Sequence, residues 1–362
     1  MPTANDIASA VQSVWLDGVS PSELRSGRIE QRQRAAPVAG LATSPGAYAS
    51  ALTADASLRS AVSERAEVAG TDPERVFWEL AVDDLRAGAD LLAERHRTSG
   101  GADGYVALEL PATLAHDDQG LVARAVDLVE RVERPNLMVS VPATAEGIRA
   151  TAQLTTRGVS TNVRPLFSVG QAEAAREAYL DGLERRHEAR QPLDGVASVA
   201  TVEVAPLDRR GNEVLPEENR NELSVAVARL AYERWLMTHT IDRRWSRLRR
   251  AGAHPQRLAW AAGQPLDGAP GATFYPERLV APDTVLAVTA ETLDAVNQLD
   301  QVLLPRLDRR DVGKAVHVSA VAAEHEADPE ALARRLQSEE LARSARSFDD
   351  LLATIRQVAL AA

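Results

Sequence analysis

The stretch "LMVSVPATAEGIRATAQLTTRGVS", residues 137–160, establishes the fold class because it holds a strand and a helix in direct succession. The apolar run 137–141 is typical of a short buried strand, with Ser140 pointing inward near its end. Thr144 and Gly158 then mark the start and the stop of a helix over 145–157. A nearly continuous apolar strand followed by a helix is typical of a parallel sheet that helices cover.

The same alternation continues in both directions from this unit. Strands are predicted at 13–17, 38–43, 105–110, 137–141, 160–166, 196–204, 257–262 and 284–288, and helices at 57–68, 74–97, 117–133, 145–157, 170–190, 219–250 and 290–299. Eight strands that alternate with helices predict an α/β fold, a single (β/α)8 TIM barrel that takes up residues 1–362. Residues 263–277, rich in Gly and Pro, are predicted to form a loop.

The tail is predicted to be a helical C-terminal extension, residues 305–362, that packs on the outside of the barrel. Pro305 interrupts the chain, and two polar-apolar helices are predicted after it, at 328–344 and 347–361.

Composition excludes several classes of protein. The formal net charge of −11 argues against nucleic acid as a partner, and the basic stretch 243–252 is interpreted as a solvated helix face. No apolar run reaches the ~18–20 residues that cross a bilayer, so no membrane association is expected. The N-terminus lacks the features of a signal peptide and cysteine is absent, which together predict a cytoplasmic protein. Lys314 is the single lysine of the chain.

Several ordered motifs resemble the transaldolase family, in particular its longer bacterial type. They include "SVWLDGVSPSELRSG", "FWELAVDDLRAGADLL", "LAHDD", "RPNLMVSVPATAEGI", "TNVRPLFS", "GVASVA" and "LVAPDTVLAVTAETLDA". The resemblance covers most of the chain and implies a (β/α)8 barrel. It also implies a class I aldolase mechanism, in which a lysine forms a Schiff base with a ketose phosphate and carboxylates transfer protons.

Some residues match the family pattern. The resemblance implies proton transfer by Asp17, orientation of a catalytic water by Glu109, and a site role for Asn162. In "ATSP", residues 42–45, Thr43 and Pro45 fit the pattern, and Ser44 stands where the family has asparagine.

Other positions depart from the pattern. Ser140 replaces the Schiff-base lysine, Arg164 a threonine, and Thr201 a serine. Pro206 aligns with the arginine that grips the substrate phosphate, and Ala262 stands in a turn where the family is rich in serine. A serine hydroxyl cannot form an iminium with a ketone. Lys314 is predicted to lie in a peripheral segment, so both the Schiff base and the phosphate grip are expected to be lost.

Side-chain alternation along a strand predicts what replaces the lost groups. Arg164 shares the inward face of Asn162, and Glu203 shares that of Thr201, so both are expected at the barrel mouth with Asp17 and Glu109. Two interpretations stay open at this point. Arg164 and Glu203 form a structural pair that fills space, or they belong to a rebuilt acid/base site.

The candidate residues are catalytic Asp17, Glu109, Asn162 and Ser140, and substrate-binding Thr43, Ser44, Arg164, Thr201 and Glu203. Three functions are considered: a divergent enzyme that performs acid/base chemistry on a sugar-like or carbonyl compound, a non-catalytic relative, and a working transaldolase of the pentose phosphate pathway. The expected partner is a small molecule, a sugar or sugar phosphate, and the chain is expected to be a monomer or a homodimer. No cofactor and no metal are expected, because Asp117, near His116 and Asp118, is interpreted as a helix cap.

Overall fold

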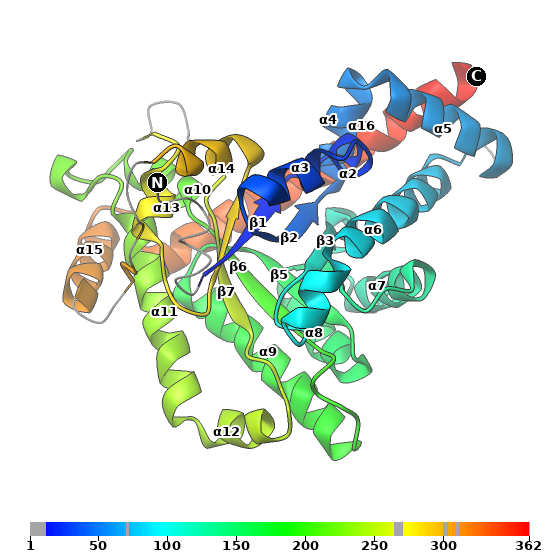
Figure 1. The fold of residues 1–362 in the computed structure, drawn as a ribbon. Helices are drawn as coiled ribbons and strands as arrows, with labels where there is room; N and C mark the ends of the chain where they lie inside the picture. The colour runs from blue at the N-terminus through cyan, green and yellow to red at the C-terminus, as the bar shows by residue number, and fades with distance from the viewer. Residues whose placement is uncertain are drawn as a thin grey trace.

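The computed structural model describes residues 12–69, 72–263, 271–299, 303, 305–307 and 311–361. Eight parallel strands close into a barrel in chain order (Figure 1), which confirms the predicted TIM-barrel fold. The strands are β1 (Ser13–Asp17), β2 (Val38–Thr43), β3 (Tyr105–Glu109), β4 (Leu137–Pro142), β5 (Ser160–Leu166), β6 (Ser198–Glu203), β7 (Arg257–Ala261) and β8 (Val285–Val288).

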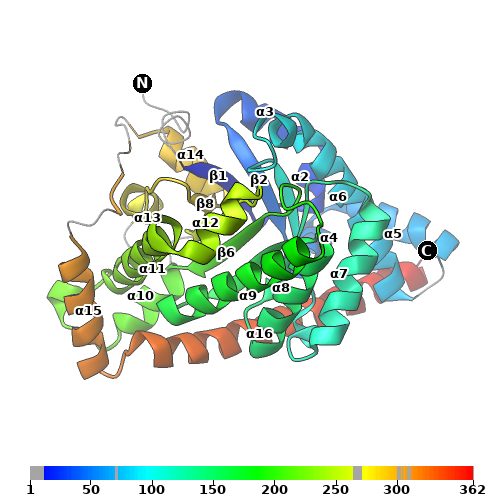
Figure 2. The ribbon, with the colours of Figure 1, turned by 90° about the horizontal axis from the view of Figure 1, so that it is seen from below.

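Helices surround the barrel (Figure 2). Those described are α2 (Pro21–Arg25), α3 (Arg28–Ala35), α4 (Pro45–Ala54), α5 (Ala56–Ala69), α6 (Pro73–Thr98), α7 (Asp118–Val132), α8 (Ala145–Arg157), α9 (Val169–Glu188), α10 (Ala205–Gly211), α11 (Leu223–Ile241), α12 (Arg243–Arg250), α13 (Phe274–Arg278), α14 (Ala290–Asn297), α15 (Val312–Glu324) and α16 (Pro329–Ala361). None of the described helices is long and apolar enough to cross a bilayer.

Two predictions of elements that precede the tail were wrong. The helix expected over 219–250 is two helices, α11 and α12, because the Asp242 carboxylate accepts a hydrogen bond from the Arg244 amide at 2.7 Å and caps a new helix. The loop expected over 263–277 ends in helix α13, while residues 264–270 lie outside the described residues.

The unit 137–160 shows how local sequence sets the connections. The Thr144 hydroxyl accepts a hydrogen bond from the Gly147 amide at 3.0 Å and starts α8. A Cβ on Gly147 would lie 1.7 Å from the Pro142 carbonyl oxygen, so this turn between β4 and α8 requires glycine. Gly158 then ends the helix with a φ of +85°.

The barrel interior is filled mainly by small side chains around two large rings, those of Trp15 and Tyr105. Trp15 lies against Gly40, where an added Cβ would come within 2.4 Å of the indole. Alanines from several strands complete this inner cluster, among them Ala42, Ala107 and Ala259. The larger aliphatic side chains of the strands face the surrounding helices.

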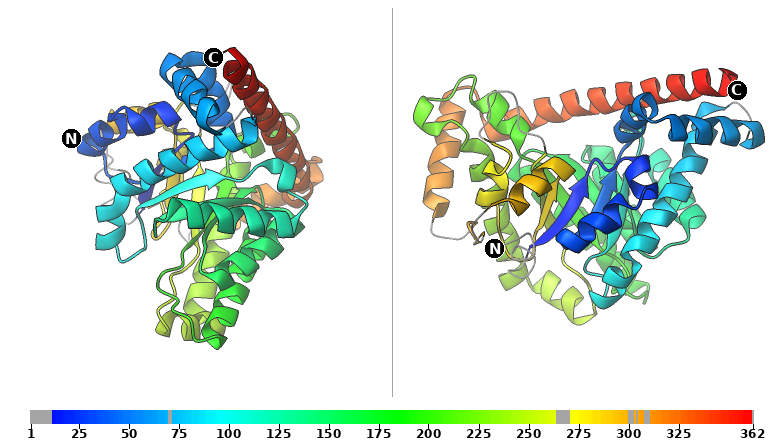
Figure 3. Two further views of the ribbon diagram at one scale, coloured as in Figure 1. Left: turned by 90° about the vertical axis from the view of Figure 1, so that its right-hand side faces the viewer. Right: turned by 45° about the horizontal axis from the view of Figure 1, so that its top comes forward.

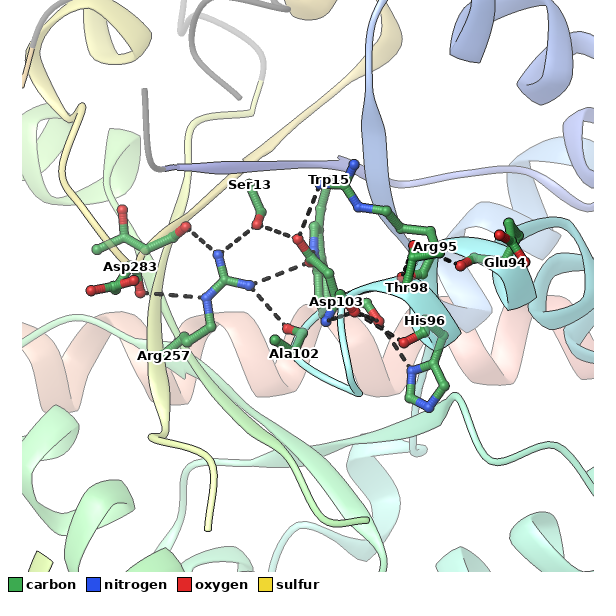
Figure 4. A network of polar contacts seen from close by, with 12 residues as sticks. Ser13, Trp15, Glu94, Arg95, His96, Thr98, Ala102, Asp103, Arg257 and Asp283 are labelled. Atoms are coloured by element: carbon green, nitrogen blue, oxygen red, sulfur yellow. Dashed lines mark hydrogen bonds and ion pairs between the residues drawn. The ribbon is translucent and has the colours of Figure 1, made fainter. Parts of the chain in front are cut away.

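A charged network lies at the amino-terminal end of the barrel (Figure 4). The buried Asp103 carboxylate accepts hydrogen bonds from Ser13, from the Trp15 indole at 3.3 Å and from Arg257 at 3.3 Å. Arg95 adds a longer contact at 3.5 Å. These groups line a cavity of about 380 Å³ at the amino-terminal end. Active sites in barrels of this class lie at the opposite, carboxyl-terminal end.

The tail differs from its prediction. Residues 329–361 form one helix, α16, rather than two, because no glycine or proline interrupts the stretch between 329 and 361. Figure 3 shows α16 spanning the molecule, and it contacts α10 and α15 as well as α4, α5 and α6. Phe348, Leu351 and Ile355 of α16 are buried in the main core. The assignment of residues 1–362 to one domain, with 305–362 as an extension, stays a prediction.

Candidate active site

The carboxyl ends of β1, β3, β4, β5 and β6 bring a group of polar side chains to the barrel mouth. Strand register places Glu109 beside Ser140, and Ser140 beside Asn162. Because parallel strands end at the same side of a barrel, residues that are far apart in the chain meet there. We call this group the mouth cluster: Asp17, Glu109, Ser140, Asn162, Arg164, Thr201 and Glu203.

Arg164 is the centre of the mouth cluster. Its two terminal nitrogens donate to the two oxygens of Asp17, each at 3.0 Å, which is the bidentate geometry typical of arginine with a carboxylate. Nη2 also donates to Glu203 Oε1 at 2.7 Å. The guanidinium therefore joins carboxylates from β1 and β6 across the mouth.

Burial and neighbouring charges shift the pKa values of Arg164 and Glu203 in opposite directions. Burial by itself lowers the pKa of Arg164, but Asp17 and Glu203 raise it well above its ordinary value. For Glu203, burial outweighs the attraction to Arg164 and raises the pKa to about 7. The side chain of Glu203 is 19% exposed, so a group that gains and loses a proton near neutral pH remains in reach of solvent.

Glu109 lies on the same side of the barrel and is bound by a residue that the sequence analysis did not identify. The Ser344 hydroxyl of α16 donates to Glu109 Oε1 at 2.8 Å. Burial raises the pKa of Glu109, while Arg164 and the hydrogen bond from Ser344 oppose the rise. No sequence signal pointed to Ser344, because a lone serine in a polar-apolar helix is typical of the protein surface.

Asn162 and Thr201 form a second contact at the mouth. The Thr201 hydroxyl donates to Asn162 Oδ1 at 2.6 Å, and both residues are buried. Ser140, next to Asn162 in the register, is 2% exposed. The strand position where the family resemblance places a lysine is thus a closed environment of short polar side chains.

The two candidates from β2 and the following turn have different environments. Thr43 is buried, and its hydroxyl has no hydrogen-bond partner among the residues that the structure describes. Ser44 caps α4 by accepting from the Ala47 amide at 3.3 Å. It lines a groove of about 850 Å³ with Arg25 and with Gly18, the residue that follows Asp17.

Lys314 does not approach the mouth cluster. It lies on α15, and its Nζ is 2.8 Å from Glu222 Oε2, with the lysine side chain 61% exposed. Glu222 is the residue that precedes α11, on the outside of the barrel. Pro206 is the second residue of α10 and has no side-chain donor for a phosphate. Ala262, which follows β7, is buried.

The weaker motifs have structural roles. Asp117 caps α7 by accepting from the Gly120 amide at 2.9 Å, as predicted. His116 is 3.3 Å from Glu146, and within the described ranges no group of three or more potential ligands gathers around a metal position. In the basic stretch 243–252, Arg244 and Arg247 form ion pairs with carboxylates of α9.

The fold and the site together define a (β/α)8 barrel protein with an acidic cluster and one arginine at the carboxyl ends of its strands. Comparison with known proteins makes this more specific. Residues 14–355 match the family model described as "Transaldolase/Fructose-6-phosphate aldolase". The chain belongs to the transaldolase family.

Individual relatives agree. The chain is 35% identical over 302 residues to the transaldolase of Mycobacterium ulcerans, an alignment that covers 82% of this chain and 81% of the relative. It is 34% identical to the transaldolase of Mycolicibacterium smegmatis over the same shares. Against the transaldolase of a Parafrankia species it is 33% identical over 298 residues, 80% of each chain.

Proposed function

We propose that this transaldolase-family barrel works without a Schiff base and performs acid/base chemistry on a sugar-like or carbonyl small molecule. The observation that carries the proposal is the Arg164 guanidinium, which holds Asp17 and Glu203 together at the barrel mouth. Family membership supports an enzyme of the transferase or aldolase kind. The name of the matched family supports a sugar phosphate as the substrate class.

Two observations support the loss of imine chemistry. Ser140 occupies the position of the family lysine and has no amine. Lys314 is held by Glu222 on the outside of the barrel. An ion-paired ammonium on a peripheral helix cannot supply the neutral amine that attacks a carbonyl at the barrel mouth.

The proposed role of each residue in the mouth cluster follows from its charge and its hydrogen-bonding groups. Glu203, with a pKa of about 7, donates or accepts a proton, and Asp17 and Glu109 are the further acid/base groups. Arg164 holds an anionic or carbonyl oxygen of the ligand once one of its present partners is displaced. Asn162 and Thr201 position the ligand, and Thr43, Ser44 and Ser140 contribute hydroxyls around it.

Proton exchange tests this proposal directly. In D2O, the protein is expected to accelerate deuterium incorporation next to the carbonyl of dihydroxyacetone or fructose 6-phosphate, followed by proton NMR. The D17N and E203Q variants should lose most of this acceleration, and Glu67→Gln, an exposed glutamate on α5, should not change it. An acceleration that survives in both mouth variants would contradict the proposal.

Covalent trapping separates the proposal from an ordinary transaldolase. The protein is incubated with fructose 6-phosphate and borohydride, and its mass is then measured. We expect no stable adduct, because the described part of the chain places no amine at the mouth and the single lysine, Lys314, is paired with Glu222. A mass increase on any residue of the barrel interior would restore the third function, a working transaldolase of the pentose phosphate pathway.

A specific observation favours a second candidate, a non-catalytic relative that binds a metabolite or partner protein. Asp17, Arg164 and Glu203 satisfy one another, as a purely structural ion-pair group would. A D17A/E109A variant that keeps the full biological effect of the protein would favour this candidate. The cytoplasmic location, the lack of a cofactor and the monomeric or homodimeric state remain predictions.

A further inference from the structure

Helix α16 crosses the carboxyl-terminal end of the barrel and contacts the segments that follow several strands. Glu330 accepts from the Ser168 hydroxyl at 2.7 Å and from the Gly170 amide at 2.9 Å, after β5. Gln337 donates to the Ala143 carbonyl at 2.7 Å, after β4. Glu339 pairs with Arg210, after β6, at 3.1 Å. The helix is therefore bound to the rim of the mouth at several points along its length.

One face of α16 changes character along its length. The spacing of Gln337, Glu340, Ser344 and Phe348 by three or four residues puts them on the same side of the helix. Except for the partly buried Leu341, this side is polar where it passes the mouth, and it becomes apolar from Phe348 onward, where the helix is buried in the core. A polar segment within an otherwise packed face requires polar partners opposite it.

One of those partners, that of Ser344, belongs to the mouth cluster. Ser344 donates to Glu109 Oε1 at 2.8 Å. Glu340 forms an ion pair with Arg343, one turn away on the same helix, at 2.5 Å. Its negative charge also acts on both Glu109 and Glu203, in the direction that favours their protonated forms.

We propose that α16 is a wall of the active site, in which Ser344 is a positioning residue for Glu109. This inference rests on the proposed function of the same site. The hydrogen bond occupies one oxygen of Glu109 and restricts rotation of its carboxyl group. The other oxygen is then aligned for proton transfer, as an acid/base group requires.

A labelled-carbon titration tests the positioning role without a substrate. With 13C at the glutamate side-chain carboxyls, NMR follows the titration of Glu109 in the intact protein. The charged groups that act on Glu109 are Arg164 and Asp17 of the barrel and Glu340 of α16. Ser344→Ala removes the donor and should raise the pKa of Glu109, Ser344→Thr should restore it, and Glu340→Gln should lower it.

Ser347→Ala is the matched control, because Ser347 lies on the same helix but faces α4. A Cβ added to Gly46 of α4 would lie 3.8 Å from the Ser347 Cβ. The control should leave the titration of Glu109 unchanged. Alanine favours the helical state, so Ser344→Ala is expected to keep α16 folded, which circular dichroism checks. An unchanged titration of Glu109 in Ser344→Ala would overturn the positioning role.

The exchange of dihydroxyacetone protons gives the functional readout. Ser344→Ala should lower the maximal rate at least tenfold and shift the pH profile to higher pH, with Ser344→Thr restoring both. A shifted titration with an unchanged rate and profile would also overturn the inference. If the wild-type protein catalyses no exchange, the proposed function fails, and the titration separately decides whether α16 holds Glu109.

Discussion

Arg164 shows at the scale of single residues how this chain departs from the family pattern. Its guanidinium bridges Asp17 and Glu203 within hydrogen-bond distance, and Ser140 stands nearby, where the resemblance places a lysine. A delocalised cation that is always charged cannot act as an amine nucleophile. Among the residues that the structure describes, the mouth therefore carries the positive charge of Arg164 but no amine that could make a covalent intermediate.

Ser140→Lys by itself is expected not to restore transaldolase activity. The new lysine would lack the arginine that grips the phosphate, because Pro206 stands at that position, and Arg164 would oppose it as a second cation. A coupled assay of dihydroxyacetone transfer from fructose 6-phosphate to erythrose 4-phosphate measures this. Strong transfer by the variant would show that the remainder of the pocket is intact.

Glu203→Gln is expected to change how stability depends on pH. The folded protein keeps a proton on Glu203 up to a pKa of about 7, whereas the unfolded chain loses it near the ordinary value of 4.5. Stability from this group is thus complete below about pH 4.5 and is lost as pH rises through about 7, by up to ~3 kcal/mol. Urea unfolding at pH 5 and pH 8 should show this loss in the wild type and a smaller one in the variant. Equal losses would count against the raised pKa.

At the scale of elements, the two ends of the barrel strands carry different kinds of polar group. The amino end holds Asp103 between Ser13, Trp15 and Arg257, with the carboxylate side chain only 8% exposed. The carboxyl end holds an excess of carboxyl groups around one arginine. The first arrangement is balanced and contributes to stability, whereas the second leaves protonatable groups, which are useful for chemistry.

Asp103→Ala is expected to destabilise the protein by about 3–5 kcal/mol, because it leaves the largely buried Arg257 without its carboxylate. The matched control is Asp90→Ala, which removes a pair with Arg134 in which the aspartate is 57% exposed. That control should cost at most about 1 kcal/mol. Chemical unfolding of both variants measures the difference, and similar costs would contradict a structural role for the Asp103 network.

At the scale of the whole molecule, α16 joins the end of the chain to the barrel. Phe348 is 4% exposed, and its ring lies 5.7 Å from that of Phe77 on α6 in an edge-on arrangement. The apolar half of the helix supplies packing energy, and this attachment presents Ser344 to Glu109. The site and the stability of the fold therefore depend on the same helix.

Phe348→Ala is expected to cost about 3–5 kcal/mol of folding stability through the cavity it leaves in the core. Leu360→Ala, near the end of the same helix, is the control, since Leu360 is 72% exposed. It should change stability by less than about 0.5 kcal/mol. Thermal and urea unfolding of the two variants measure this, and equal costs would mean that α16 is not anchored through Phe348.

Local sequence patterns were sufficient to predict the barrel, the approximate strand positions and the lack of a lysine in the strands. Eight apolar runs of the correct length and a glycine such as Gly158 at a helix end are local signals, because they depend on backbone geometry and on burial of one face. The alternation of side chains along β5 and β6 was also sufficient to expect Arg164 and Glu203 at the mouth.

The partners that these residues bind became evident only in the folded chain. Arg164 and Asp17 lie on β5 and β1, far apart in sequence, and their pairing depends on closure of the sheet. The continuity of α16 and the contact of Ser344 with Glu109 also follow from packing between distant parts of the chain. Secondary-structure propensity depends on residues that are neighbours along the chain. An active site is made by side chains that come together only when the chain folds.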